Sequence, residues 1–158
     1  MINVNIINKS DNKLPEYKHN GDAGMDVRAN ITKEWLIENN LDITESNEIL
    51  LKPNERILIP TGLYFQLPFG FEMQIRPRSG LALKNGITVL NSPGTLDFSY
   101  NNELKIILIN HSNANFIINH GDRICQIVFN KFEEATLNQV NDFENISDRG
   151  GFGSTGVK

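Results

Sequence analysis

The amino-acid sequence predicts an all-β fold, a jelly-roll-like barrel of short antiparallel strands with one or two short helices. In several short runs, apolar residues recur at every second position, as in a strand with one buried face. Between these runs stand proline, glycine and asparagine, which preset φ or tolerate positive φ in turns. With 158 residues, the chain is long enough for one domain with a real hydrophobic core.

The predicted strands can be read in order along the chain. Alternating apolar residues occur in Ile2-Val4-Ile6, Leu63-Phe65-Leu67, Phe71-Met73-Ile75 and Ile124-Gln126-Val128, and Ile87–Leu90 is a further apolar strand. Turns are predicted at 52–55, 68–70, 92–94 and 119–122. Short strands joined by such turns favour antiparallel pairing.

Two short helices interrupt the strands. Thr32 to Asn40 reads as a capped helix of one or two turns. We expect the surrounding segment 30–51 to be a surface insertion with Trp35 packed on the barrel, and a role in partner binding is the alternative. In the second helix, good helix formers end at Gly86, so Ser79 is expected to be its N-cap.

Composition excludes several classes of function. Fifteen Lys and Arg against nineteen Asp and Glu give a net charge of -4, which disfavours a nucleic acid partner. The longest apolar run, Ile106–Ile109, is too short to cross a membrane. No secretory signal is visible at the N-terminus, so we expect a cytoplasmic protein, in the host cytoplasm if the chain is phage-borne.

A metal ion bound by histidine or cysteine and a reactive thiol are disfavoured as well. The three histidines show no metal-ligand spacing with one another or with the single cysteine. Cys125 stands among apolar residues of a predicted strand, where a buried thiol is expected rather than a nucleophile.

Residues 76–100 carry groups suited to a nucleoside triphosphate. Arg78 and Ser79 precede the second helix, and a helix start with free N–H groups, a hydroxyl and a guanidinium can cradle phosphate. Asp97 follows the Ser92-Pro93-Gly94 turn and is a candidate general base, with a turn residue as the plain alternative. Tyr100 is a candidate stacking surface.

Five short segments, in order, resemble the motifs of the trimeric dUTP pyrophosphatase (dUTPase) family. They are Ala23–Ala29, Arg76–Ile87, Asn91–Tyr100, Gly121–Gln126 and Arg149–Gly156. The resemblance spans residues 23–156, nearly the whole chain. It implies a dUTPase-like barrel domain over residues 1–143 and a flexible C-terminal arm over 144–158.

The resemblance implies hydrolysis of dUTP to dUMP and pyrophosphate by attack of water on the α-phosphorus. Asp97 would hold and deprotonate the water, while Mg²⁺ would be held by the phosphates and waters, without a protein ligand. Arg78, Ser79, Gly80 and Gln126 would contact the phosphates. The Ser79 hydroxyl would donate to the departing pyrophosphate and is counted as catalytic.

The base and sugar would be recognised by the third motif. Asn91 and the hairpin residues Gly94, Thr95 and Leu96 resemble the uracil clamp of the family, in which peptide groups copy the pairing edge of adenine. For Asn91, stabilisation of the turn is the alternative. Tyr100 would lie against the deoxyribose and exclude a 2′-hydroxyl, with a buried core tyrosine as the alternative.

The remaining expected roles fall on the first, second, fourth and fifth motifs. Asp26 would act from the second coordination sphere, orienting the arm arginine or a metal-bound water. Arg76 and Arg123 are expected to make structural ion pairs. The arm would close over the nucleotide through these residues: Arg149, Phe152, Gly153, Ser154 and Thr155.

By the same resemblance the chain forms a homotrimer whose sites are shared between subunits. Two other readings stay open. A dUTP-binding regulatory module with little turnover is favoured by the altered third motif, where Phe98, Ser99 and Asn102 depart from the family pattern. A dCTP deaminase-type relative is weaker, because no catalytic glutamate stands between Arg76 and Tyr100.

Overall fold

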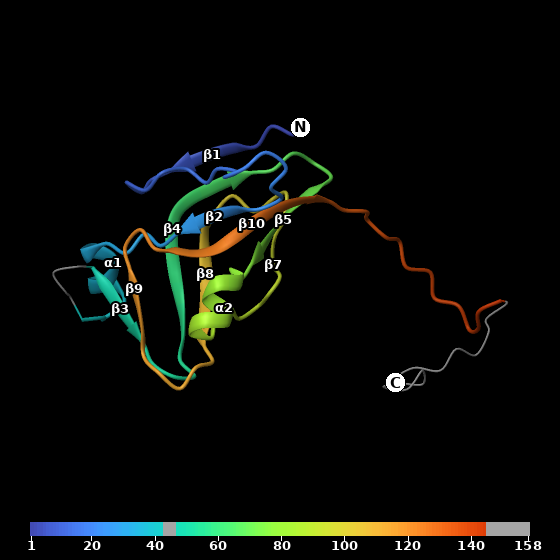
Figure 1. The fold of residues 1–158 in the computed structure, drawn as a ribbon. Helices are drawn as coiled ribbons and strands as arrows, with labels where there is room; N and C mark the ends of the chain where they lie inside the picture. Colours follow the sequence, from blue (N-terminus) through green and yellow to red (C-terminus); the bar gives the residue numbers. More distant parts are fainter. Residues whose placement is uncertain (43–46, 145–158) are drawn as a thin grey trace.

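The computed structural model of the chain describes residues 1–42 and 47–144. Most of its regular structure is short β-strands, with two helices between them (Figure 1). In chain order the elements are β1 (Asn5–Asn8), β2 (Met25–Arg28), α1 (Lys33–Glu38), β3 (Glu48–Leu51), β4 (Arg56–Gln66), β5 (Phe71–Arg76), α2 (Ser79–Asn85), β6 (Ile87–Val89), β7 (Gly94–Leu96), β8 (Glu103–Asn110), β9 (Phe116–Asn119) and β10 (Arg123–Lys131).

The strands pair only antiparallel, in three sheets of the described chain. Two sheets have four strands each, in the orders β1-β4-β8-β6 and β2-β10-β5-β7, and β3 pairs with β9 in a third. These pairings confirm the predicted all-β architecture of short antiparallel strands. Contacts within the fold are mostly long-range in sequence, as expected where no local helix packing builds the core.

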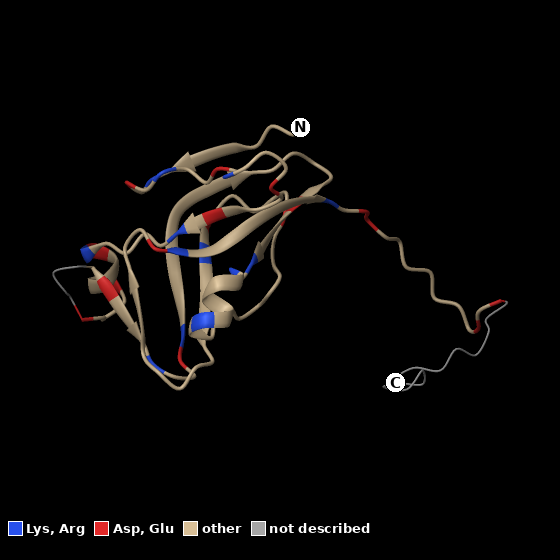
Figure 2. Cartoon of the chain, viewed as in Figure 1, with Lys and Arg blue, Asp and Glu red and all other residues tan. Residues whose placement is uncertain are grey.

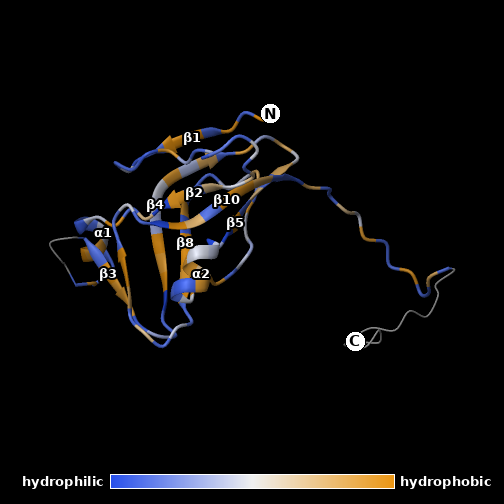
Figure 3. Cartoon of the chain, viewed as in Figure 1, coloured by the Kyte–Doolittle hydropathy of each residue, from blue (hydrophilic) through white to orange (hydrophobic). Residues whose placement is uncertain are grey.

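The core is filled by the apolar side chains that the strands direct inward. Figure 3 shows the hydrophobic character of β4 and β8, which pair with each other. Met73 of β5 and Ile127 of β10 are fully buried. The predicted alternation in β10 was incomplete, since Ile124 and Cys125 are both buried in succession where the register shifts by a bulge.

The segment 30–51 has the predicted helix but is more than a surface insertion. The Thr32 hydroxyl caps α1 by accepting the Trp35 N–H at 3.2 Å. Trp35 packs against the core as expected, and Leu36 is fully buried. Because β3 also pairs with β9, the described part of this segment contributes to the core itself.

Helix α2 begins one residue earlier than predicted. Its N-cap is Arg78, whose side chain makes no capping bond, and Ser79 is the first helical residue. The Ser79 cap was therefore wrong, because the backbone leaves its extended conformation after Arg78 and not after Ser79. The predicted end is confirmed, with Gly86 in the left-handed conformation at φ 67°.

Beyond β10 the described chain leaves the barrel. Residues 132–144 form neither strand nor helix and run outward in Figure 1. Three of their apolar side chains, Leu137, Val140 and Phe143, are exposed. Neither of the helices in the described chain is long and apolar enough to span a membrane.

The environment of Cys125 predicts an inert thiol. Its side chain is fully buried, and that burial raises the pKa of the thiol, with the Asp26 carboxylate adding to the rise. The reactive thiolate is therefore scarce near neutral pH. We expect no reaction with a chromogenic disulfide reagent at pH 8 in the native protein, and one thiol per chain in denaturant. Rapid native reaction, followed by absorbance, would show that the β10 core opens readily.

Candidate functional site

One end of the β2-β10-β5-β7 sheet gathers a cluster of opposite charges. The Asp26 carboxylate of β2 accepts from Arg78 Nε at 2.8 Å and from an Arg123 guanidinium nitrogen at 3.0 Å. A second Arg78 nitrogen donates to the Arg123 carbonyl oxygen at 3.1 Å. In Figure 2, acidic and basic segments adjoin on β2 and at the start of β10. The cluster ties β2, β10 and the start of α2 together.

This cluster fixes geometry more than it adds stability. The side chains of Arg78, Asp26 and Arg123 keep 25%, 31% and 43% of their exposure, so water screens their attraction. Both carboxylate oxygens of Asp26 are engaged by guanidinium groups. With Nε and one terminal nitrogen held, Arg78 presents its other terminal nitrogen in a defined direction.

The start of α2 and Gln126 lie beside this cluster. Ser79 and Gly80 are exposed, and a Cβ built on Gly80 meets no heavy atom within 4 Å. The first N–H groups of a helix have no partner within the helix, so they face open space here. Gln126 donates to the Pro77 carbonyl oxygen at 2.9 Å, which aligns its amide with the chain entering α2.

Gly24 of the first motif packs closely against the side-chain amide of Gln126. A Cβ on Gly24 would lie 2.5 Å from Gln126 Oε1, so a side chain there would displace Gln126. These residues border a groove of about 570 Å³. It is lined by Lys13, Leu14, Glu16, Lys18, Asp22, Ala23, Gly24, Asp26, Arg28, Arg123 and Gln126. Sequence reasoning missed Lys13 and Lys18, which no motif marks.

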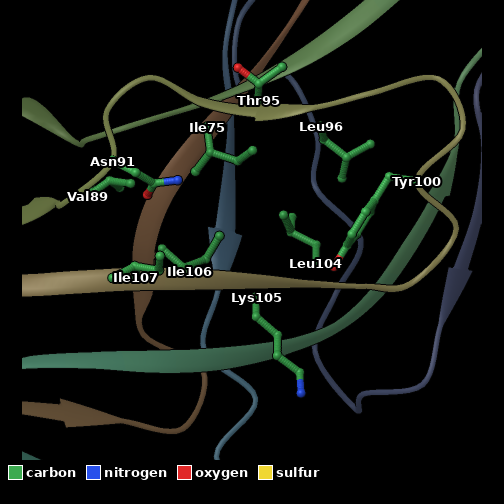
Figure 4. A pocket seen from close by; sticks show the side chains of 11 residues that line it. Ile75, Val89, Asn91, Thr95, Leu96, Tyr100, Leu104, Lys105, Ile106 and Ile107 are labelled. Atoms are coloured by element: carbon green, nitrogen blue, oxygen red, sulfur yellow. The ribbon is translucent and has the colours of Figure 1, made fainter.

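A second pocket, of about 180 Å³, lies at the connection between β6 and β7, which belong to different sheets (Figure 4). We call it the hairpin pocket, after the predicted motif. Its lining comprises Ile75, Val89, Asn91, Gly94, Thr95, Leu96, Tyr100, Leu104, Lys105, Ile106 and Ile107. Every third-motif residue predicted for base and sugar recognition, namely Asn91, Gly94, Thr95, Leu96 and Tyr100, is in this lining. The β8 and β5 residues were missed, because long-range strand pairing brings them there.

The start of β7 is tightly packed at Gly94. A Cβ on Gly94 would lie 3.2 Å from Ile75 Cβ and 3.3 Å from Asn91 Nδ2. The predicted turn contains a cis peptide bond between Ser92 and Pro93. β7 holds the hairpin against β5, with Gly94 opposite Ile75. The Asn91 amide lies on the side of the pocket formed by Val89 and Ile107 (Figure 4).

Asp97 and Tyr100 follow β7 in a short loop. The Tyr100 N–H donates to the Asp97 carbonyl oxygen, and the Tyr100 hydroxyl donates to the Glu103 carbonyl oxygen, each at 3.1 Å. Tyr100 is 41% exposed, so the alternative of a buried core tyrosine is wrong. The Asp97 carboxylate is exposed and makes no hydrogen bond or ion pair within residues 1–42 and 47–144.

Two other expectations concern arginines. Arg123 makes the predicted ion pair, with Asp26. Arg76 does not pair with a carboxylate in the described chain and instead donates twice to the amide oxygen of Gln74, at 3.0 and 2.6 Å. Its strand register explains the difference, since Gln74 is its same-face neighbour and Gln126 its cross-strand partner.

The candidate site is divided between two places on one chain. The hairpin pocket and the groove beside Asp26 share no lining residue. Arg149, Phe152, Gly153, Ser154 and Thr155 lie outside the described residues. The described geometry thus provides a base-sized slot in one place and a cationic, donor-rich helix start in another.

Comparisons with known proteins give one consistent result. The dUTPase family model matches residues 38–156. The deoxyuridine 5′-triphosphate nucleotidohydrolase of Finegoldia magna is 48% identical over 98% of this chain and 99% of its own length. That of Treponema denticola is 50% identical over 91% of each chain.

A solved structure of the same kind shares the fold. A variant dUTPase of Staphylococcus bacteriophage 80alpha with dUpNHpp superposes with a TM-score of 0.79, covering 99% of this chain and all of its own, at 24% identity. The family match and the near-complete overlap with relatives agree with the order of the five motifs. This chain is a member of the dUTPase family.

Proposed function

We propose that this chain hydrolyses dUTP to dUMP and pyrophosphate. The observation that carries the proposal is the hairpin pocket, where Asn91, Gly94, Leu96 and Tyr100 line one slot next to the exposed carboxylate of Asp97. The relatives named deoxyuridine 5′-triphosphate nucleotidohydrolase are 45–50% identical over 91–98% of the chain, which supports hydrolysis over a module with little turnover.

Base selection would follow from the shape and polarity of the slot. Apolar side chains of β5, β6 and β8 pack the faces of a flat ring, while the Asn91 amide and hairpin peptide groups meet its polar edge. Gly94 lies close to the side chain of Ile75, so the backbone of Gly94 itself forms this part of the pocket wall. A pyrimidine with an added methyl group or reversed donors would be rejected at this edge.

Proton transfer would fall to Asp97. An exposed carboxylate that makes no hydrogen bond with the described residues is able to accept a proton from a water beside the α-phosphorus. When bound to the phosphate oxygens, Mg²⁺ would neutralise charge there. The chain fits such a metal without a ligand of its own: among the described residues there is no cluster of three acidic, His or Cys groups, and Asp26 is already held by two arginines.

The phosphates would be held at the start of α2. The Arg78 terminal nitrogen without a partner in the described chain, the Ser79 hydroxyl and the N–H groups of the first turn would donate to the phosphates, and the space beside Gly80 is open. Such donors stabilise charge that grows on a departing pyrophosphate. Asp26 would act indirectly, by fixing the direction of Arg78.

The division of the site supports a homotrimer with shared sites. Arg78, Ser79, Gly80 and Gln126, the proposed phosphate contacts, are absent from the lining of the slot, so in a trimer the slot of one copy would stand beside the phosphate contacts of another. The barrel would span residues 1–131, the segment 132–143 would lead away from it, and the arm 144–158 would close over the nucleotide from a third copy. The exposed apolar residues just before the arm, including Leu137 and Phe143, suit contact with a neighbour.

Asp97→Asn tests the assignment of the base. The substitution keeps the size of the side chain but removes its basicity, so turnover of dUTP should fall about 10²-fold or more, while dUMP affinity and melting temperature stay near native. Steady-state pyrophosphate release measures the turnover of dUTP, and calorimetry measures the dUMP affinity and the melting temperature. Glu134→Gln, which removes an exposed charge away from both pockets, is the control. Native turnover in the Asp97→Asn variant would remove Asp97 as the base.

Tyr100→Ala tests the exclusion of a 2′-hydroxyl. Removing the ring should narrow the ratio of kcat/KM for dUTP over UTP by about tenfold or more, the size of a lost steric contact. Tyr100→Phe keeps the ring and loses only the bond to Glu103, so it should retain discrimination. Tyr17→Ala, at an exposed tyrosine outside the slot, is the control. Equal ratios in all variants would reject Tyr100 as the gate.

Deleting residues 144–158 tests the arm. The truncated protein should sediment as a trimer and bind dUMP, yet its dUTP turnover should fall by about 10²-fold, because a lid excludes water and aligns the α-phosphorus. Removing only residues 157–158, which lie beyond the fifth motif, is the control. Turnover within about twofold of native after the long deletion, or a monomeric mass for the full chain, would contradict the proposal.

A further inference from the structure

The loop that carries Asp97 and Tyr100 has few anchors outside itself. Within the described chain, the hydrogen bonds of residues 97–102 all end inside 97–103: the Tyr100 N–H on Asp97, the Tyr100 hydroxyl on Glu103, and the Asn101 amide on Ser99. The strand before it, β7, is an edge strand of three residues. Glu103 is the first residue of β8, so its bond with Tyr100 ties that side of the loop to a sheet, whereas Phe98 makes no hydrogen bond within the described chain.

An aromatic contact links the Phe98 side of the loop to another part of the described fold. The Phe98 ring meets the Phe69 ring edge-on, with centroids 5.6 Å apart and planes at 87°. This is a favoured arrangement, because the positive edge of one ring faces the negative face of the other. Phe69 and Phe98 nevertheless stay 71% and 43% exposed, so hydrophobic burial alone does not account for the pairing.

Phe69 stands on a well-supported turn. It lies between β4 and β5, which belong to the two different large sheets. The turn is closed by the bond from the Phe71 N–H to the Pro68 carbonyl oxygen at 3.2 Å. The chain that leaves β10 is also tied to it, by a 3.2 Å bond from the Phe132 N–H to the Gly70 carbonyl oxygen. Because these bonds hold the backbone of the turn, Phe69 has a stable position against which Phe98 can pack.

We infer that Phe98 is a positioning residue, which holds the Asp97–Tyr100 loop in place by packing against Phe69. Phe98 itself is absent from the lining of the nucleotide slot. Its effect passes through its neighbour Asp97, whose carboxylate must stand within hydrogen-bond reach of the attacking water. The inference rests on the proposed role of Asp97 and concerns a residue that departs from the family pattern of the third motif.

The test compares Phe98→Ala, Phe69→Ala and the double variant in the full-length protein. Each single change should lower kcat for dUTP about threefold to tenfold, the range for a lost aromatic pair, with KM and melting temperature near native. The double variant should be no slower than the slower single variant, because both remove one contact. Phe98→Tyr keeps an aromatic ring and should restore turnover, and Ile37→Ala, an exposed apolar residue of α1, is the matched control.

Unchanged kcat in the single variants, or effects that multiply in the double variant, would overturn the inference. A second measurement is independent of turnover: hydrogen exchange of a peptide covering 97–103 should be faster in both single variants, and equal exchange would also overturn it. If the native protein releases no pyrophosphate from dUTP, the proposed function fails, and loop exchange alone then decides whether Phe98 positions the loop.

Discussion

The carboxylate of Asp26 is the point on which the phosphate-binding half of the molecule depends. It holds Arg78 and Arg123 at once, and through them it fixes the entry to α2 against β2 and β10. Paired charges of this kind contribute little net stability where water reaches them, but they restrict direction. A fixed guanidinium is preorganised for a phosphate, so less freedom is lost when the ligand binds.

The fold was largely predictable because local rules and tertiary packing agree in most strands. Alternating residues such as Met73 and Ile75 of β5 are buried where the period-2 pattern places them. The pattern failed in β10, where a bulge lets consecutive residues face the core. It failed also at Ser79, because a cap depends on where the backbone turns, and the residue type alone does not decide this.

The site was predictable only where short motifs place residues close together in sequence. Asn91, Gly94 and Tyr100 fall in one pocket because a single hairpin and its following loop carry them. The side chains opposite, such as Ile107, come from strand pairing that no local pattern reveals. Arg76 illustrates the same limit: its charge suggested an acidic partner, whereas its strand neighbour supplied a neutral amide.

Helix α2 has a loose connection to the core. None of its side chains is buried, and of its residues Leu81 packs partly against the core. Seven residues are too few for a helix to persist in isolation, so its order depends on the flanking strands and on the turn at Gly86. Segments with few apolar contacts open at a small free-energy cost while the rest of a protein stays folded. The barrel can therefore remain folded when α2 unfolds locally. Substitutions at outward-facing residues of α2, such as Leu83, should change the free energy of unfolding of the domain little.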